Sequence, residues 1–135
     1  MSFSTYLENT LLDEVFGGTG YTPPATLYIG LSTTVLDSDD DVPTEPAGGG
    51  YARADVTNNA TNFPATGGDG IKANGQPITF DQATGDWGTV THFFIADAAT
   101  GNTNILAYGV LGTPKTIGNG DTASFAAGAL TITLD

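Results

Sequence analysis

Residues 87–98, Trp-Gly-Thr-Val-Thr-His-Phe-Phe-Ile-Ala-Asp-Ala, constrain the fold more than any other stretch of the chain. Side chains of a β-strand alternate between two faces, and this segment places apolar residues on both. Strict alternation puts Trp87, Thr89, Thr91, Phe93 and Ile95 on one face, and Val90, His92, Phe94 and Ala96 on the other. The pattern predicts a central strand that is covered on both sides.

Shorter alternating runs surround this segment and are separated by glycine-rich turns; they span 26–34, 51–57, 77–81, 105–111 and 130–134. The run at 105–111 follows a connection of hairpin length and is expected to return antiparallel to 87–98. Asn119-Gly120 is typical of a tight hairpin. About eight short strands with frequent turns predict an all-β fold, an antiparallel β-sandwich or open barrel with one N-terminal α-helix.

Residues 1–18 predict that helix. Phe3, Leu7, Leu11 and Val15 recur every fourth residue, and a second set widens the apolar stripe: Tyr6, Leu12 and Phe16. Ser2 or Ser4 can cap its start, and the glycines at 17 and 18 end it. The helix either covers one end of the β domain, residues 26–135, or docks on another subunit.

Two stretches, about 35–50 and 58–76, lack a clear periodic pattern. Connections in compact domains usually have about four to six residues. Loops this long are normally functional, ordered by a neighbour, or disordered. We expect the second stretch to be held by a neighbouring molecule.

The charge balance excludes some partners. Fifteen acidic residues accompany three basic ones, Arg53, Lys72 and Lys115, which gives a net charge of −12. Three cations cannot neutralise a row of phosphates, so nucleic acid is excluded and anionic membranes are disfavoured. The chain has no cysteine, no visible signal peptide and no apolar run long enough to span a membrane, which suits folding in a reducing cytoplasm.

Little in the sequence indicates enzymatic chemistry. His92 is the one histidine and lies mid-strand, and no nucleophile turn or phosphate-binding loop is present. We expect no catalytic residue and no cofactor. A small glycan-active enzyme using Asp81, Asp86 or Asp97 is a weaker alternative.

Two candidate binding sites each have a simpler interpretation. Asp37, Asp39 and Asp41 have the spacing that opens a calcium loop, but Val42 replaces the glycine of its sharp turn and Gly48 replaces the bidentate glutamate. A solvated acidic loop is the expected alternative. An aromatic platform for sugars has four candidate residues, which at this spacing are more typical of a core: Trp87, Phe93, Phe94 and Tyr108.

Four segments resemble a family of small tailed-phage virion proteins, usually labelled phage tail fibre or phage structural proteins. They read PATLYIGLSTT, EPAGGGYAR, PITFDQATGDWGTVTHFFIADAATGN and GDTASFAAGALTITLD. The resemblance covers nearly the whole chain, and Gly-Tyr-Ala-Arg and Trp-Gly-Thr-Val-Thr-His are its more specific parts. The chain departs from the pattern at 100–104, where Gly101-Asn102 replaces a double glycine.

The resemblance implies a non-enzymatic virion protein made in the host cytoplasm. Its size favours a capsid cement protein on the outside of the head, bound to the major capsid protein as a homotrimer or dimer. The alternative is a tail fibre or tail-associated adhesion protein that binds surface glycans. The residues expected to contact partners are Phe3, Tyr6, Leu7, Leu11, Val15, Arg53, Phe63 and Lys72. The alternative for Arg53 is an interaction with a carboxylate of its own fold, such as Asp55 or Asp97.

Overall fold

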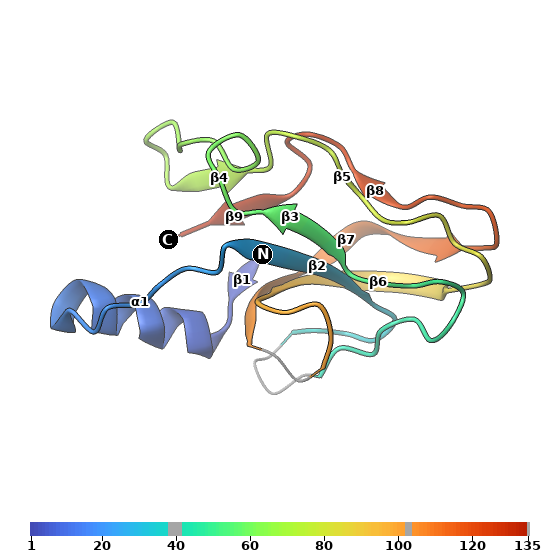
Figure 1. The fold of residues 1–135 in the computed structure, drawn as a ribbon, viewed down its shortest axis with the longest axis horizontal. Coiled ribbons are helices and arrows are strands. Elements are labelled where there is room, and N and C mark those ends of the chain that lie inside the picture. Colours follow the sequence, from blue (N-terminus) through green and yellow to red (C-terminus); the bar gives the residue numbers. More distant parts are fainter. Residues whose placement is uncertain (38–41, 102–103, 135) are drawn as a thin grey trace.

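A computed structural model describes residues 1–37, 42–101 and 104–134 of the chain (Figure 1). These residues form one helix, α1 (Thr5–Gly17), and nine strands. The strands are β1 (Ser2–Phe3), β2 (Thr26–Ser32), β3 (Ala54–Thr57), β4 (Ile71–Ala73), β5 (Ile78–Thr79), β6 (Gly88–Ala96), β7 (Ile105–Ile117), β8 (Ser124–Phe125) and β9 (Thr131–Thr133). The all-β prediction with one N-terminal helix is confirmed.

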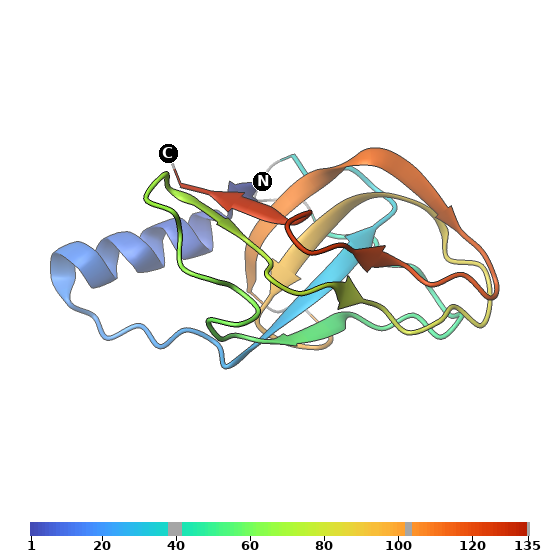
Figure 2. The ribbon, with the colours of Figure 1, turned by 90° about the horizontal axis from the view of Figure 1, so that it is seen from above.

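One antiparallel sheet of five strands, in the order β1-β7-β6-β2-β3, forms the main layer. Two short antiparallel pairs, β4-β9 and β5-β8, lie along one side of this sheet (Figure 2). The arrangement is sandwich-like, with a second layer that is much shorter than the first.

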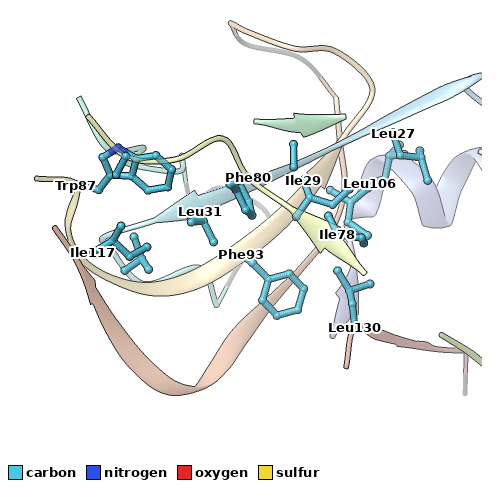
Figure 3. Close-up of a cluster of buried hydrophobic side chains, with 14 of the residues drawn as sticks. Leu27, Ile29, Leu31, Ile78, Phe80, Trp87, Phe93, Leu106, Ile117 and Leu130 are labelled. Atoms are coloured by element: carbon cyan, nitrogen blue, oxygen red, sulfur yellow. The ribbon is translucent and has the colours of Figure 1, made fainter. Parts of the chain in front are cut away.

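The main core fills the space between the two layers (Figure 3). It takes side chains from both, including Leu27, Ile29, Leu31, Ile78, Phe80, Trp87, Phe93, Leu106, Ile117 and Leu130. A smaller cluster of Leu36, Phe94 and Ala96 packs separately. Strand β6 supplies residues to both clusters, so the prediction of a central strand covered on both sides is confirmed.

The strict alternation expected for β6 is wrong at one place. The pairing with β7 shifts between Val90 and His92, so that Thr91 alone lies opposite four residues of β7, 111–114. Such a bulge reverses the inside-outside pattern beyond it. Val90 therefore belongs to the same core cluster as Phe93 and Ile95.

The hairpin expected at Asn119-Gly120 is also wrong. A turn is present, with the Asp121 amide donating to the Gly118 carbonyl at 3.0 Å. However, the strand before it, β7, pairs with β6 and β1, whereas β8 after it pairs with β5. The turn thus carries the chain from one layer to the other.

Helix α1 begins later than the apolar stripe predicts. Ser4 is the N-cap, and its hydroxyl accepts a hydrogen bond from the Leu7 amide at 3.2 Å. Phe3 lies in β1, opposite Ala107. Gly18 ends the helix in the left-handed region at φ 62°, as the glycines predicted.

Candidate functional site

Helix α1 extends away from the β layers at one end of the molecule (Figures 1 and 2). None of its side chains is buried. Leu7 packs against the main core, and Leu11 is half-buried. The exposed fractions then rise along the helix to 57% for Leu12, 68% for Val15 and 83% for Phe16. The distal half of α1 therefore presents apolar side chains that its own fold leaves uncovered.

The two ends of α1 are held in place. At the start, the Ser4 amide donates to the Leu106 carbonyl at 2.9 Å, and the Ser4 hydroxyl donates to the Ile105 carbonyl. At the far end, a carboxylate oxygen of Glu14 accepts from the amides of Gly20 and Tyr21, both at 2.7 Å. The helix is therefore a defined projection, fastened to β7 at one end and to the returning chain at the other.

The contacts predicted for the helix residues remain predictions. The structure places Tyr6 and Val15 at the surface, 42% and 68% exposed, whereas Phe3, Leu7 and Leu11 are half-buried. The same helix carries Glu8, Asp13 and Glu14 and no basic residue. The apolar end of α1 is thus accompanied by negative charge.

Arg53 is engaged within its own chain. Its side chain is 6% exposed and forms a two-pronged ion pair with Glu45, with Nε–Oε1 at 3.0 Å and Nη2–Oε2 at 2.9 Å. Nη1 also donates to the Ala98 carbonyl at 2.7 Å, and the guanidinium lies 5.0 Å from the centre of the Phe94 ring. A carboxylate within the fold was one expectation for Arg53, but the partner is Glu45 and not Asp55 or Asp97. Bidentate pairs of this kind are geometrically specific, so Arg53 fastens the loop before β3 to the turn after β6.

Tyr51 extends this network. Its hydroxyl donates to Oε1 of Glu45 at 2.7 Å and accepts from the Leu31 amide at 2.9 Å. Burial and, secondarily, the hydrogen bond to the Glu45 carboxylate raise the pKa of Tyr51 above its ordinary value of 10. Its ring packs edge-on against Trp87, with ring centres 5.2 Å apart.

The two most specific segments of the resemblance therefore meet in space. The Trp87 indole also donates to the Gly49 carbonyl at 2.8 Å. Gly49 has φ 59°, and a Cβ there would lie 2.8 Å from the Gly85 carbonyl oxygen. The glycine turn at 48–50 and the segment that begins with Trp87 are therefore joined by a hydrogen bond and by close packing, which together form one structural lock. The sequence alone did not indicate this structural role.

The aromatic platform for sugars is not formed. Trp87 is 3% exposed, Phe93 is 8% exposed and Phe94 is fully buried. Tyr108 is half-buried and packs against the smaller core cluster. These four aromatic side chains stabilise the fold and do not together offer a flat surface to a ligand.

The stretch 58–76 is held by its own chain. Phe63, predicted to contact a partner, is a core residue with 5% exposure, so its side chain is covered by its own fold. The ammonium group of Lys72 donates to the Pro64 carbonyl at 3.0 Å. The strand β4 within this stretch pairs with β9.

Asn74, which the sequence analysis did not single out, fixes the end of this stretch. It is 2% exposed, and its amide nitrogen donates to the carbonyls of Gln76 and Ala126 at 2.8 and 2.9 Å. Its amide oxygen accepts from the Leu130 amide at 2.9 Å. An Asn-Gly pair normally predicts only a turn, whereas this asparagine ties the stretch to the C-terminal turn.

The metal and catalytic candidates gain no site among the described residues. Asp39 and Asp41 lie outside the described residues, and Asp37 is exposed. Within residues 1–37, 42–101 and 104–134, no group of three potential metal ligands comes together. The helix in this part of the chain is too short to span a membrane.

His92 is buried and its Nδ1 lies 2.8 Å from the Thr91 hydroxyl, as expected for a structural histidine. The Asp97 carboxylate accepts from the backbone and side-chain amides of Asn104 at 3.1 and 2.8 Å.

Comparison with known proteins identifies the family. The sequence model described as podophage GP4 fiber I protein gp80 matches residues 2–133, nearly the whole chain. The chain belongs to this family. It is therefore a structural component of a bacteriophage virion, as the resemblance implied. No curated protein matches the sequence.

Proposed function

We propose that this protein is a non-enzymatic fibre subunit of a podophage virion, and that it attaches to the particle through the distal half of α1. The fibre role follows the family description, which matches residues 2–133. The observation that carries the attachment role is the exposure of Leu12, Val15 and Phe16 on a helix fixed at both ends. Apolar patches of this kind on a soluble protein mark interaction sites.

The rest of the fold supports a structural role. The buried polar groups Arg53, Tyr51 and Asn74 are used to join segments of the chain, not to line a reaction site. Among the described residues, no buried side-chain nitrogen or oxygen lacks a hydrogen-bond partner. A catalytic group usually has a perturbed environment and access to a cleft, and none of these three combines both.

The test is incorporation into virions. A phage encoding Val15→Asp together with Phe16→Asp is expected to yield particles that lack the protein, measured by quantitative mass spectrometry of purified virions. Both positions are exposed, so the purified variant should keep the unfolding temperature of the wild type. The matched control is Leu134→Asp, an equally exposed apolar residue outside the helix at 64%. Wild-type copy number with the double helix variant would contradict the proposal.

A capsid cement protein is the second candidate. The short chain of 135 residues and its net charge of −12 suit a decoration protein on the outside of a head. In this role the partners are the major capsid protein and two or more copies of the chain. Copy number separates the candidates, because cement proteins occupy a whole shell whereas fibres are few. Immunogold labelling of particles would place the protein on the head or on the tail.

A further inference from the structure

A groove opens between the second half of β7 and the segment 121–125, which includes β8. Its volume is about 560 Å³. The floor is apolar and contains Leu31, Phe80, Val90, Leu111, Ile117 and Phe125, and the rim carries hydroxyl groups and Lys115. A cavity of this size accommodates several apolar side chains.

The groove exists because two strand edges are left apart. On its second edge, β7 pairs with β1 only at Ala107 and Tyr108. The pairing with β6 then jumps from Val110 to Lys115, so that four residues of β7 lie opposite Thr91 alone. This bulge curves β7 away from the sheet, as Figure 2 shows. Gly112 within it has open space around its Cα.

The groove and the exposed end of α1 lie at opposite ends of the molecule. In Figures 1 and 2 alike, α1 projects on the left, whereas the end of β7 and the strand β8 lie on the right. Since the helix is fastened at Ser4 and Glu14, it cannot turn back to its own groove. The two apolar surfaces can therefore be covered by each other only between different copies.

The helix end is acidic, and the groove offers it one basic side chain. Lys115 lines the groove and is exposed, whereas Arg53 is paired with Glu45 and Lys72 donates to the Pro64 carbonyl. The helix carries three carboxylates and no cation. Asp121 also lines the groove, where its Oδ2 accepts from the Gly118 amide at 2.8 Å, so the groove has one acidic and one basic side chain. Lys115 is the group in the groove that can pair with a helix carboxylate.

We propose that the distal half of α1 from one copy of this protein binds in the β7–β8 groove of a second copy. Leu12, Val15 and Phe16 would cover the apolar floor, with the acidic helix beside Lys115. Such a contact is heterologous, since it joins two different surfaces, and it generates rings or open filaments. The inference rests on the proposed function, in which α1 is the attachment element, and names a second copy as its partner.

The test uses the purified full chain and analytical ultracentrifugation over a range of concentrations. Wild-type protein is expected to associate reversibly. Phe16→Asp removes the helix anchor, and Gly112→Trp fills the groove. Phe16→Asp is expected to weaken association by about 30-fold or more, the effect of losing one large buried apolar side chain. Gly112→Trp should weaken it by a similar factor, because it excludes such a side chain from the groove. Circular dichroism and unfolding temperature establish that both variants are folded.

The decisive measurement mixes the two variants. The Phe16→Asp copy keeps an intact groove, and the Gly112→Trp copy keeps an intact helix. An equimolar mixture should therefore form a one-to-one complex and nothing longer. Lys115→Glu should also weaken association, and Asp13→Lys combined with it should restore a part of the loss.

Three results would overturn the inference. They are a wild-type chain that stays monomeric at millimolar concentration, a mixture of the two variants that stays monomeric, and association that survives Gly112→Trp. Loss of virion incorporation in the Val15→Asp, Phe16→Asp phage would still support attachment through α1 to another virion protein. The proposed function and this inference can therefore fail separately.

Discussion

Replacement of Asn74 by alanine should destabilise the fold more than any exposed polar substitution. The side chain makes three hydrogen bonds and is 2% exposed. Each neutral hydrogen bond contributes about 0.5–1.5 kcal/mol to stability, and a buried group left without a partner costs about 1–3 kcal/mol. The buried Leu130 amide loses its acceptor in this variant. The free energy of unfolding should therefore fall by about 3–5 kcal/mol.

Urea unfolding followed by circular dichroism measures this loss. For a chain of this size the unfolding temperature should drop by about 10–20 °C. Asn74→Asp is a second variant with the same shape. It keeps an acceptor for the Leu130 amide but loses both donors and adds a buried charge, so it should be at least as unstable.

The matched control is Asn58→Ala. Its side chain makes one exposed hydrogen bond, to the Pro24 carbonyl at 2.9 Å, and its loss should cost less than about 1 kcal/mol. If the free energy of unfolding of Asn74→Ala lies within about 1 kcal/mol of the wild-type value, with an unchanged denaturant slope, Asn74 does not join the stretch 58–76 to the C-terminal turn as described.

Two further predictions concern the lock between the glycine turn and the tryptophan strand. Gly49→Ala should lower the free energy of unfolding by at least about 2–3 kcal/mol, because the new Cβ meets the Gly85 carbonyl in a left-handed backbone. Gly48→Ala, at φ 76° in open space, should cost only about 1 kcal/mol; equal losses in the two variants would refute the steric argument. The pKa of Tyr51 is raised, so the folded chain keeps the hydroxyl proton above pH 10 whereas the unfolded chain releases it. The contribution of this hydroxyl to the free energy of unfolding is therefore fully present below pH 10. Above pH 10 it falls by up to about 1.4 kcal/mol per pH unit. Tyr51→Phe should remove that part of the alkaline slope in urea titrations between pH 9 and 11, and an unchanged slope would argue against the buried hydroxyl.

Local sequence patterns predicted where helices and strands form better than they predicted which strands pair. The cap at Ser4 and the stop at Gly18 depend on neighbouring residues only, and both were predictable. The strand 88–96 was recognisable because apolar residues occupy both of its faces. The bulge after Val90 was not, since its extra residues lie in β7 and not in β6 itself.

Features that depend on distant contacts escaped prediction for the same reason. Asn119-Gly120 has the composition of a hairpin, but its flanking strands find better partners in two different layers. Phe63 stands in a stretch without periodicity, and only the packing of the whole fold places it in the core. Glu45 was visible as one carboxylate among fifteen acidic residues, and nothing local marked it as the partner of Arg53.

The attachment of α1 to β7 has a consequence for synthesis on the ribosome. Ser4 caps the helix and also bonds to Ile105, 101 residues later in the chain. At translation rates of about 5–20 residues per second, the helix waits about 5–20 s before the strand that seats it has been made. During that interval its apolar side chains meet chaperones and nascent neighbours before they meet their own fold. A partner that binds this helix thus has an early opportunity to capture it.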